Sequence, residues 1–283
     1  MDPIVARKTW RTVEPIHGMI YFVPEAAEEY AALGVSGRSG YFASRSAPMG
    51  QVGAEVVVAT FFNFHPDLVR DAMDGVWTTT TPVSVGGARM RAADRSLHRV
   101  LGPEVLSSDD VAEAAALARR AAEAACAMPE GRPLFAGHAS LDWPDESHLV
   151  LWHAQTLLRE FRGDGHVALL TASGLTGLDA LILHAATQEL PRAALQQTRL
   201  WSDDEWQAGI EALARRGLVG ADGAFTDPGR DLRTQIEAAT DRLATAPYAA
   251  LGESGCDRLR LLARPLSRAI VDTGMLGAMR DAS

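Results

Sequence analysis

The chain has 283 residues, of which 47% are hydrophobic and 22% charged, and its formal net charge at pH 7 is -9. This length suits two ordinary domains or one large domain of two similar halves, and the composition excludes wholesale disorder. The acidic balance weighs against a nucleic-acid partner, because proteins that bind phosphate backbones usually carry a basic surplus. Cys126 and Cys256 have no cysteine or histidine at metal-ligand spacing, so we interpret them as free thiols.

The N-terminal segment lacks the apolar stretch of a signal peptide. The longest apolar run, residues 167–186, contains Thr171, Asp179 and His184, and it therefore predicts a buried helix and not a membrane span. We expect a cytoplasmic protein without a membrane partner.

The first half of the chain, residues 1–135, is predicted to be helical. Residues 14–33 are expected to form a helix that Pro24 interrupts, because proline removes a backbone donor. Apolar helices are expected within residues 40–62, and two alanine-rich helices at about 88–101 and 109–128.

The second half, residues 136–283, opens with an amphipathic helix from about Ser147 that is predicted to end at Gly163 as a C-cap. Further along, Ser202 and Glu205 form a capping box. Two short strands are expected on either side of a turn at residues 222–223, followed by a helix that starts near Thr226 or Asp227 and a last helix at about 255–271. This order predicts a mainly α protein with a winged-helix unit at about residues 175–245.

A weak internal repeat aligns residues 40–62 with residues 165–187. The repeat favours a pseudo-duplicated architecture of two related halves with a cleft between them, although short apolar matches also arise by chance.

The start of the predicted recognition helix argues against DNA binding. Ser202 is followed by Asp203, Asp204 and Glu205, and carboxylates at this end would face the phosphate backbone. The same acids favour the helix itself, because they complement its dipole. The wing, residues 221–224, contains no basic residue.

The densest polar segment is Arg159 to His166. We expect Arg159 to orient an anionic or carbonyl substrate, and His166 to act in acid–base catalysis with Glu160 or Asp164. The alternative is a solvated loop with surface ion pairs of little energetic value.

A second candidate group consists of His17, Tyr21 and Glu25, which would share one stripe of a continuous helix and bind ligand. A boundary helix with a satisfied histidine is the alternative. Arg45 lies in an apolar stretch, where a buried guanidinium requires an anionic ligand or a carboxylate such as Glu55.

No cofactor is predicted. The eight histidines contain no HxxxH or HExxH pair, so no metal site is expected locally. A metal or haem site assembled from distant residues, such as His17 with His166, is the open alternative.

Four segments carry a family resemblance: EPIHGMIYFVPE, GYFASRSAPMG, TLLREFRGDGHVALL, and WSDDEWQAGIEALARRGLVGADGAFT with the helix after it. Together they resemble a large actinobacterial group of MarR-like helix-turn-helix proteins of unsettled function, from about His17 to Ile270. The group's pattern carries His17, Tyr21, Glu25, Arg45 and the Arg159–His166 run. Phe161 stands where a histidine is expected, which weakens a metal or haem site there. The group name implies transcription by analogy of fold alone.

We therefore expect a protein of bacterial specialised metabolism that binds a small anionic or carbonyl-containing organic molecule. The favoured activity is cofactor-independent acid–base catalysis, such as isomerisation, cyclisation or elimination. A MarR-like DNA-binding regulator and a haem- or metal-binding protein are the alternatives, and the chain could form a homodimer.

Overall fold

The computed structural model of the chain describes residues 1–276, which are mainly helical, as the sequence predicts. The helices, with 3-10 turns written η, are α1 (Pro3–Gly18), η1 (Met19–Tyr21), α2 (Pro24–Ala31), α3 (Gly37–Ser46), η2 (Ala47–Met49), α4 (Ala54–Phe61), α5 (Pro66–Met73), α6 (Val76–Thr79), α7 (Pro82–Leu101), α8 (Pro103–Leu106), α9 (Asp109–Cys126), α10 (Pro133–Ala139), α11 (Ser147–Ala172), α12 (Gly177–Ala185), α13 (Arg192–Arg199), α14 (Asp203–Arg215), α15 (Asp227–Leu243), α16 (Thr245–Ala249) and α17 (Gly252–Asp272).

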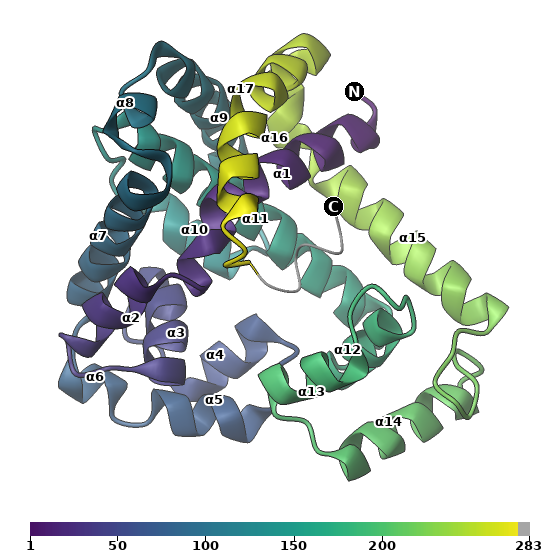
Figure 1. Cartoon of the computed structure of the whole chain (residues 1–283). Coiled ribbons are helices and arrows are strands. Elements are labelled where there is room, and N and C mark those ends of the chain that lie inside the picture. Colours follow the sequence, from purple (N-terminus) through teal and green to yellow (C-terminus); the bar gives the residue numbers. More distant parts are fainter. Residues whose placement is uncertain (277–283) are drawn as a thin grey trace.

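Helix α11 crosses the middle of the fold, and α1, α9, α10 and α15 all pack against it (Figure 1). Every residue from His148 to Leu158 is buried, as expected of a helix surrounded by others. The alanine-rich α9 lies along α11, and its inner residues Ala118, Ala121 and Ala125 are fully buried. These small side chains allow the two helices to approach closely.

The predicted end of α11 at Gly163 was wrong, because the helix continues through this glycine to Ala172. Packing against α10 and α15 outweighs the low helix propensity of glycine, which is about 1 kcal/mol per residue. The polar residues 159–166 therefore lie on a continuous helix and face different directions. His166 is six positions beyond Glu160, which places it about 240° further around the helix axis.

The predicted helix over residues 14–33 is divided. Helix α1 begins at Pro3 and is followed by η1, which carries Tyr21. Pro24 does not kink a helix but occupies the first position of α2, where its missing N–H has no partner to lose.

The buried apolar residues form two clusters within residues 1–276. The first runs from Ala6 to Phe161 and includes the C-terminal helices α16 and α17, so it contains residues on both sides of position 135. The second runs from Leu170 to Ile236 and is centred on Trp206 of α14. The division into halves at residues 135 and 136, and the internal duplication, stay predictions.

Helices α12, α13 and α14 follow one another through short turns. The capping box of α14 is confirmed, because Ser202 accepts a hydrogen bond from Glu205 N while the Glu205 carboxylate accepts one from Ser202 N. The two predicted strands are not formed. In the described chain this segment has one antiparallel bridge, between Val219 and Phe225, because Gly220 and Gly223 turn the backbone within it. Thr226 then caps α15, as predicted.

The helices α12 to α14 are docked against the first half of the chain, beside α4 and α5 (Figure 1). Gly177 at the start of α12 is in close contact with the backbone of Phe62, where a Cβ atom would lie 1.9 Å from the carbonyl oxygen. The Trp201 indole N–H donates to Asn63 O at 2.9 Å. At the start of α14, a carboxylate oxygen of Glu205 lies 2.9 Å from the His65 imidazole.

Within the described part of the chain, no helix taken singly has both the length and the hydropathy needed to cross a bilayer. The adjoining helices α11 and α12 reach these values only when taken together, and they meet at an angle of 100°.

Candidate active site

A group of charged and aromatic side chains lies beside α11, where α1, η1, α3 and α7 converge on it. We call this group the arginine cluster and define it by these residues: Glu14, His17, Tyr21, Tyr41, Arg45, Arg89, Thr156, Arg159 and Glu160. Thr156 and Glu160 share one face of α11, since they are four positions apart. The cluster unites residues that are far apart in the sequence.

The two carboxylates of the cluster are linked by Arg159, and Glu160 is shared between two guanidinium groups. Arg159 donates to Glu14 through Nε and to Glu160 through Nη1, both at 2.8 Å. Arg45 donates to Tyr41 Oη at 2.7 Å and lies 3.4 Å from Glu160 Oε1. Burial alone would raise the pKa of Glu160, but Arg159 and Arg45 lower it to about 2. Glu160 is therefore ionised at neutral pH and serves as an ion-pair partner.

Arg89 differs from the other two arginines because no carboxylate among residues 1–276 pairs with it. Its residue surface is 4% exposed, and its Nε and Nη1 atoms have no hydrogen-bond partner. Its one hydrogen bond runs from Nη2 to Tyr21 Oη at 3.4 Å, and its guanidinium lies 5.3 Å from the centre of the Trp152 ring. With Tyr21 neutral, the cluster thus contains three guanidinium groups and two carboxylates, which is a formal charge of +1.

Tyr21 and His17 form a hydrogen-bonded relay with Thr156. Thr156 donates its hydroxyl proton to Trp152 O at 3.0 Å, so its oxygen accepts from His17 Nδ1 at 2.8 Å. The other ring nitrogen of His17 then carries a lone pair, which accepts from Tyr21 Oη at 3.0 Å. This network fixes the tautomer of His17 and the direction of the Tyr21 proton.

The field of the arginines acts on both members of the relay. Burial, followed by the charges of Arg159 and Arg89, lowers the pKa of His17 well below its usual value. Burial by itself opposes ionisation of Tyr21, but the three arginine charges lower the pKa of this phenol below that of a free tyrosine. The arrangement therefore combines a neutral imidazole with an acidified phenol, which suits proton transfer.

Solvent reaches one edge of the cluster. The Arg159 side chain is 25% exposed and that of Arg45 is 11% exposed, and Tyr21 and Tyr41 are partly exposed as well. Two hollows of about 500 and 420 Å³ are lined by other residues.

Of the predicted site residues, five meet in the arginine cluster: Arg159, Glu160, Arg45, His17 and Tyr21. The expected pairing of Arg45 with Glu55 was wrong, because Glu55 pairs with Arg70 at the surface.

The other three predicted residues lie elsewhere. Glu25 leaves the stripe where α2 begins and pairs with Arg99. Asp164 accepts a hydrogen bond from Phe135 N at 2.9 Å, at the start of α10, and burial raises its pKa to about 6. His166 points toward α15, where it lies 2.9 Å from Thr240 Oγ1. None of these three touches the Tyr21 hydroxyl.

Sequence reasoning missed Arg89, Glu14 and Tyr41. A signal existed for Arg89, because it interrupts the stripe of small buried residues on α7 that includes Val85 and Ala92. Glu14 likewise lies next to Val13 on the buried face of α1. A charge on the apolar face of a helix marks either an ion pair or a ligand contact.

Several buried histidines predict an acid-labile fold. Burial lowers the pKa of His138 to about 3, and those of His153 and His166 to about 4. Below pH 6.5 the unfolded chain binds protons on these rings while the folded chain does not, so the free energy of unfolding falls as the pH drops from 6.5 to 4. Asp164 opposes this trend, because its raised pKa favours the folded state below pH 6.

We expect the free energy of unfolding to be several kcal/mol lower at pH 5 than at pH 7, as measured by urea titration. His153→Phe removes one of these titrations and keeps an aromatic ring against Trp143, so it is expected to recover about 2 kcal/mol of the loss. Equal stability of the wild type at the two pH values would show that these imidazoles are not kept neutral by the fold.

Residues 6–277 match the model of a helix-turn-helix family. No curated protein and no solved structure matches the chain. The matched span includes both the turn between α13 and α14 and every residue of the arginine cluster.

Proposed function

The chain belongs to a helix-turn-helix family, and we propose that its function lies in the arginine cluster, which binds a small organic anion. The main support for this proposal is that the Arg89 guanidinium is buried and has no carboxylate partner among residues 1–276. An unpaired buried charge costs several kcal/mol, and a bound anion would compensate it. The planar donor face of a guanidinium suits a carboxylate in particular.

The aromatic surroundings define the rest of the ligand. Tyr21, Phe61 and Trp152 lie within 4.3 to 5.5 Å of the Arg45 or Arg89 guanidinium groups, measured to the ring centres. These rings would contact an apolar or aromatic body attached to the carboxylate. The proposed ligand class is therefore an aromatic or unsaturated organic acid.

The relay gives this site an acid–base function. Tyr21 would give a proton to the bound molecule or take one from it, and His17 would hold the phenol through its neutral ring nitrogen. Isomerisation, cyclisation and elimination all need such proton movements. We assign the proton transfer to Tyr21 and His17 in place of His166 and Asp164, and we assign Glu160 to holding Arg159 and Arg45.

A DNA-binding regulator of the winged-helix, MarR-like kind is the second candidate, and the family match favours it. In such proteins the start of the recognition helix contacts the major groove, and α14 would be the recognition helix of this chain. Asp203, whose side chain is 88% exposed, and Glu205 would then face phosphates. The contact of Glu205 with His65 would also have to break. We therefore rank this candidate second.

A thermal-shift series with benzoate, 4-hydroxybenzoate and cinnamate tests the proposal against their uncharged amides. We expect the acids to raise the melting temperature of the wild type and the amides to leave it unchanged. The reason is that only an anion can compensate the excess positive charge of the cluster. Arg89→Met should abolish the response. The matched control is Arg95→Met on the same helix, since Arg95 pairs with Glu28 at the surface, and it should retain the response.

Two results would contradict the proposal. One is an equal shift for acids and amides, and the other is an equal response of Arg89→Met and Arg95→Met. Micromolar binding of random duplex DNA that weakens steeply with salt would instead support the regulator.

A further inference from the structure

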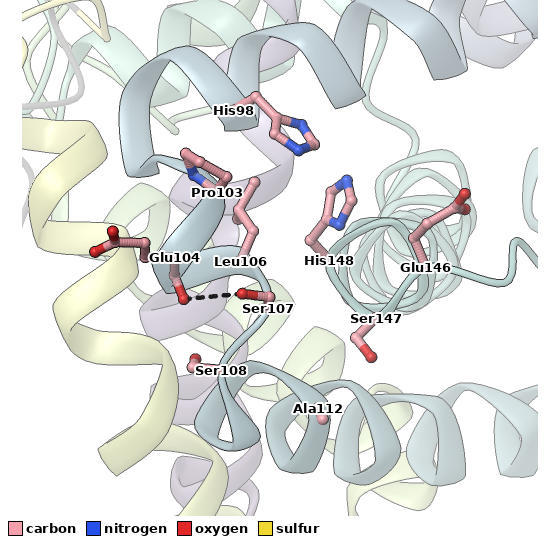
Figure 2. A pocket seen from close by; sticks show the side chains of 10 residues that line it. All are labelled: His98, Pro103, Glu104, Leu106, Ser107, Ser108, Ala112, Glu146, Ser147 and His148. Atoms are coloured by element: carbon pink, nitrogen blue, oxygen red, sulfur yellow. Dashed lines mark hydrogen bonds between the residues drawn. The ribbon is translucent and has the colours of Figure 1, made fainter.

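A second group of polar side chains lies apart from the arginine cluster, where α7 approaches the start of α11. It consists of Asp94 and His98 of α7 and His148 of α11, and we call it the histidine–aspartate group. Asp94 and His98 are four positions apart and so share one face of α7. His148 lies in the first turn of α11. Figure 2 shows the rings of His98 and His148 beside each other.

The possible ligand atoms of this group lie close together. Asp94 Oδ1 lies 2.7 Å from His148 Nε2 and 3.0 Å from His98 Nδ1, and all three atoms lie within 4.8 Å of one another. In a tetrahedral site with bonds of about 2.0 Å, the ligand atoms are about 3.3 Å apart. Small side-chain rotations would therefore bring the three atoms to ligand positions around one ion.

A hollow of about 500 Å³ adjoins the two imidazoles. Its wall includes Pro103, Leu106 and Ser108 from α8 and the start of α9, together with His98 and His148 themselves (Figure 2). An ion held by the histidine–aspartate group would thus keep a coordination position toward a space that can admit water or a small molecule. Structural zinc sites are closed by four protein ligands, whereas this arrangement leaves one position open.

We propose that Asp94, His98 and His148 bind a divalent transition-metal ion of the zinc type, with an open coordination position facing the hollow. Two imidazoles and one carboxylate suit zinc, iron, cobalt or nickel, whereas magnesium and calcium prefer oxygen ligands. Without an ion, His148 Nε2 is hydrogen-bonded to Asp94 Oδ1 and His98 Nδ1 to the Asp94 backbone carbonyl. With the ion bound, these two nitrogens would be its ligands, and each imidazole would carry its hydrogen on its other nitrogen. Histidine spacings alone do not indicate this site, because His98 and His148 are 50 positions apart and the third ligand is an aspartate.

Titration of the untagged protein with Co²⁺, followed by visible absorption, tests the site. We expect one equivalent to bind with the absorption bands of a cobalt ion in a nitrogen–oxygen site, and Zn²⁺ to displace it. His98→Gln and Asp94→Asn should each weaken binding by at least about tenfold, because loss of an outer partner of a ligand already costs this much. Both side chains are more than 40% exposed, at 44% and 42%, so these variants are expected to fold.

Glu104→Gln is the matched control, because Glu104 lines the same hollow without belonging to the histidine–aspartate group. It should bind Co²⁺ as the wild type does. Absence of one-equivalent binding by the wild type would overturn the proposal, and so would equal affinities for the wild type and His98→Gln. None of these outcomes depends on the arginine cluster, so the two proposals are tested separately.

Discussion

Glu160→Gln is expected to lower the free energy of unfolding by about 3 to 5 kcal/mol, as found when one partner of a buried ion pair is removed. The Glu160 side chain is 5% exposed, and its Oε1 atom lies 2.8 Å from Arg159 Nη1 and 3.4 Å from Arg45 Nη2. The amide preserves the size of the side chain but deprives the Arg159 and Arg45 guanidinium groups of their shared carboxylate. A loss of this size is a large part of the net stability of a typical protein.

Urea titration at pH 7 measures this loss, with Glu55→Gln as the control. Glu55 pairs with Arg70 where both side chains are exposed, at 71% and 48%, so its removal should change the stability by less than about 1 kcal/mol. If the two variants are equally stable, the arginine cluster does not depend on Glu160 for charge compensation.

Local signals allowed much of the helical fold to be predicted. The capping box at Ser202 and Glu205 and the cap at Thr226 depend on neighbouring residues alone, and both are confirmed. The end of α11 depends on packing against other helices, and the predicted end at Gly163 was wrong. The wing depends on how the chain reverses between Val219 and Phe225, and the two predicted strands are not formed. Glycine is typical of helix ends, but tertiary contacts keep Gly163 within α11.

The candidate site could be predicted only in part. His17 and Tyr21 were predicted to share one stripe of a helix, and in the structure their side chains are hydrogen-bonded at 3.0 Å across the end of α1. The segment from Arg159 to His166 contributes Arg159 and Glu160 but not Asp164 or His166, because consecutive helix positions diverge around the axis. Arg89 and Tyr21 are 68 positions apart in the sequence, so no local pattern predicts the contact between them.

Arg89→Met is expected to raise the free energy of unfolding by about 1 to 4 kcal/mol in a buffer without organic anions. Arg89 is 4% exposed and two of its nitrogens lack partners, so the folded protein carries the desolvation cost of this charge. Methionine fills much of the same space without a charge and can pack against the Trp152 ring. If Arg89→Met stabilises the protein, the wild-type arginine lowers stability, as expected of a residue that serves ligand binding.

We propose that the arginine cluster holds an excess positive charge for an anionic ligand, and the unfolding free energy of Arg89→Met tests this proposal most directly. Urea titrations of the wild type, Arg89→Met and Arg95→Met should be compared at pH 7 with chloride as the sole anion. We predict that Arg89→Met is the most stable of the three. A loss of stability in Arg89→Met larger than that in Arg95→Met would contradict this proposal. Arg89 would then stabilise the folded protein without a bound anion.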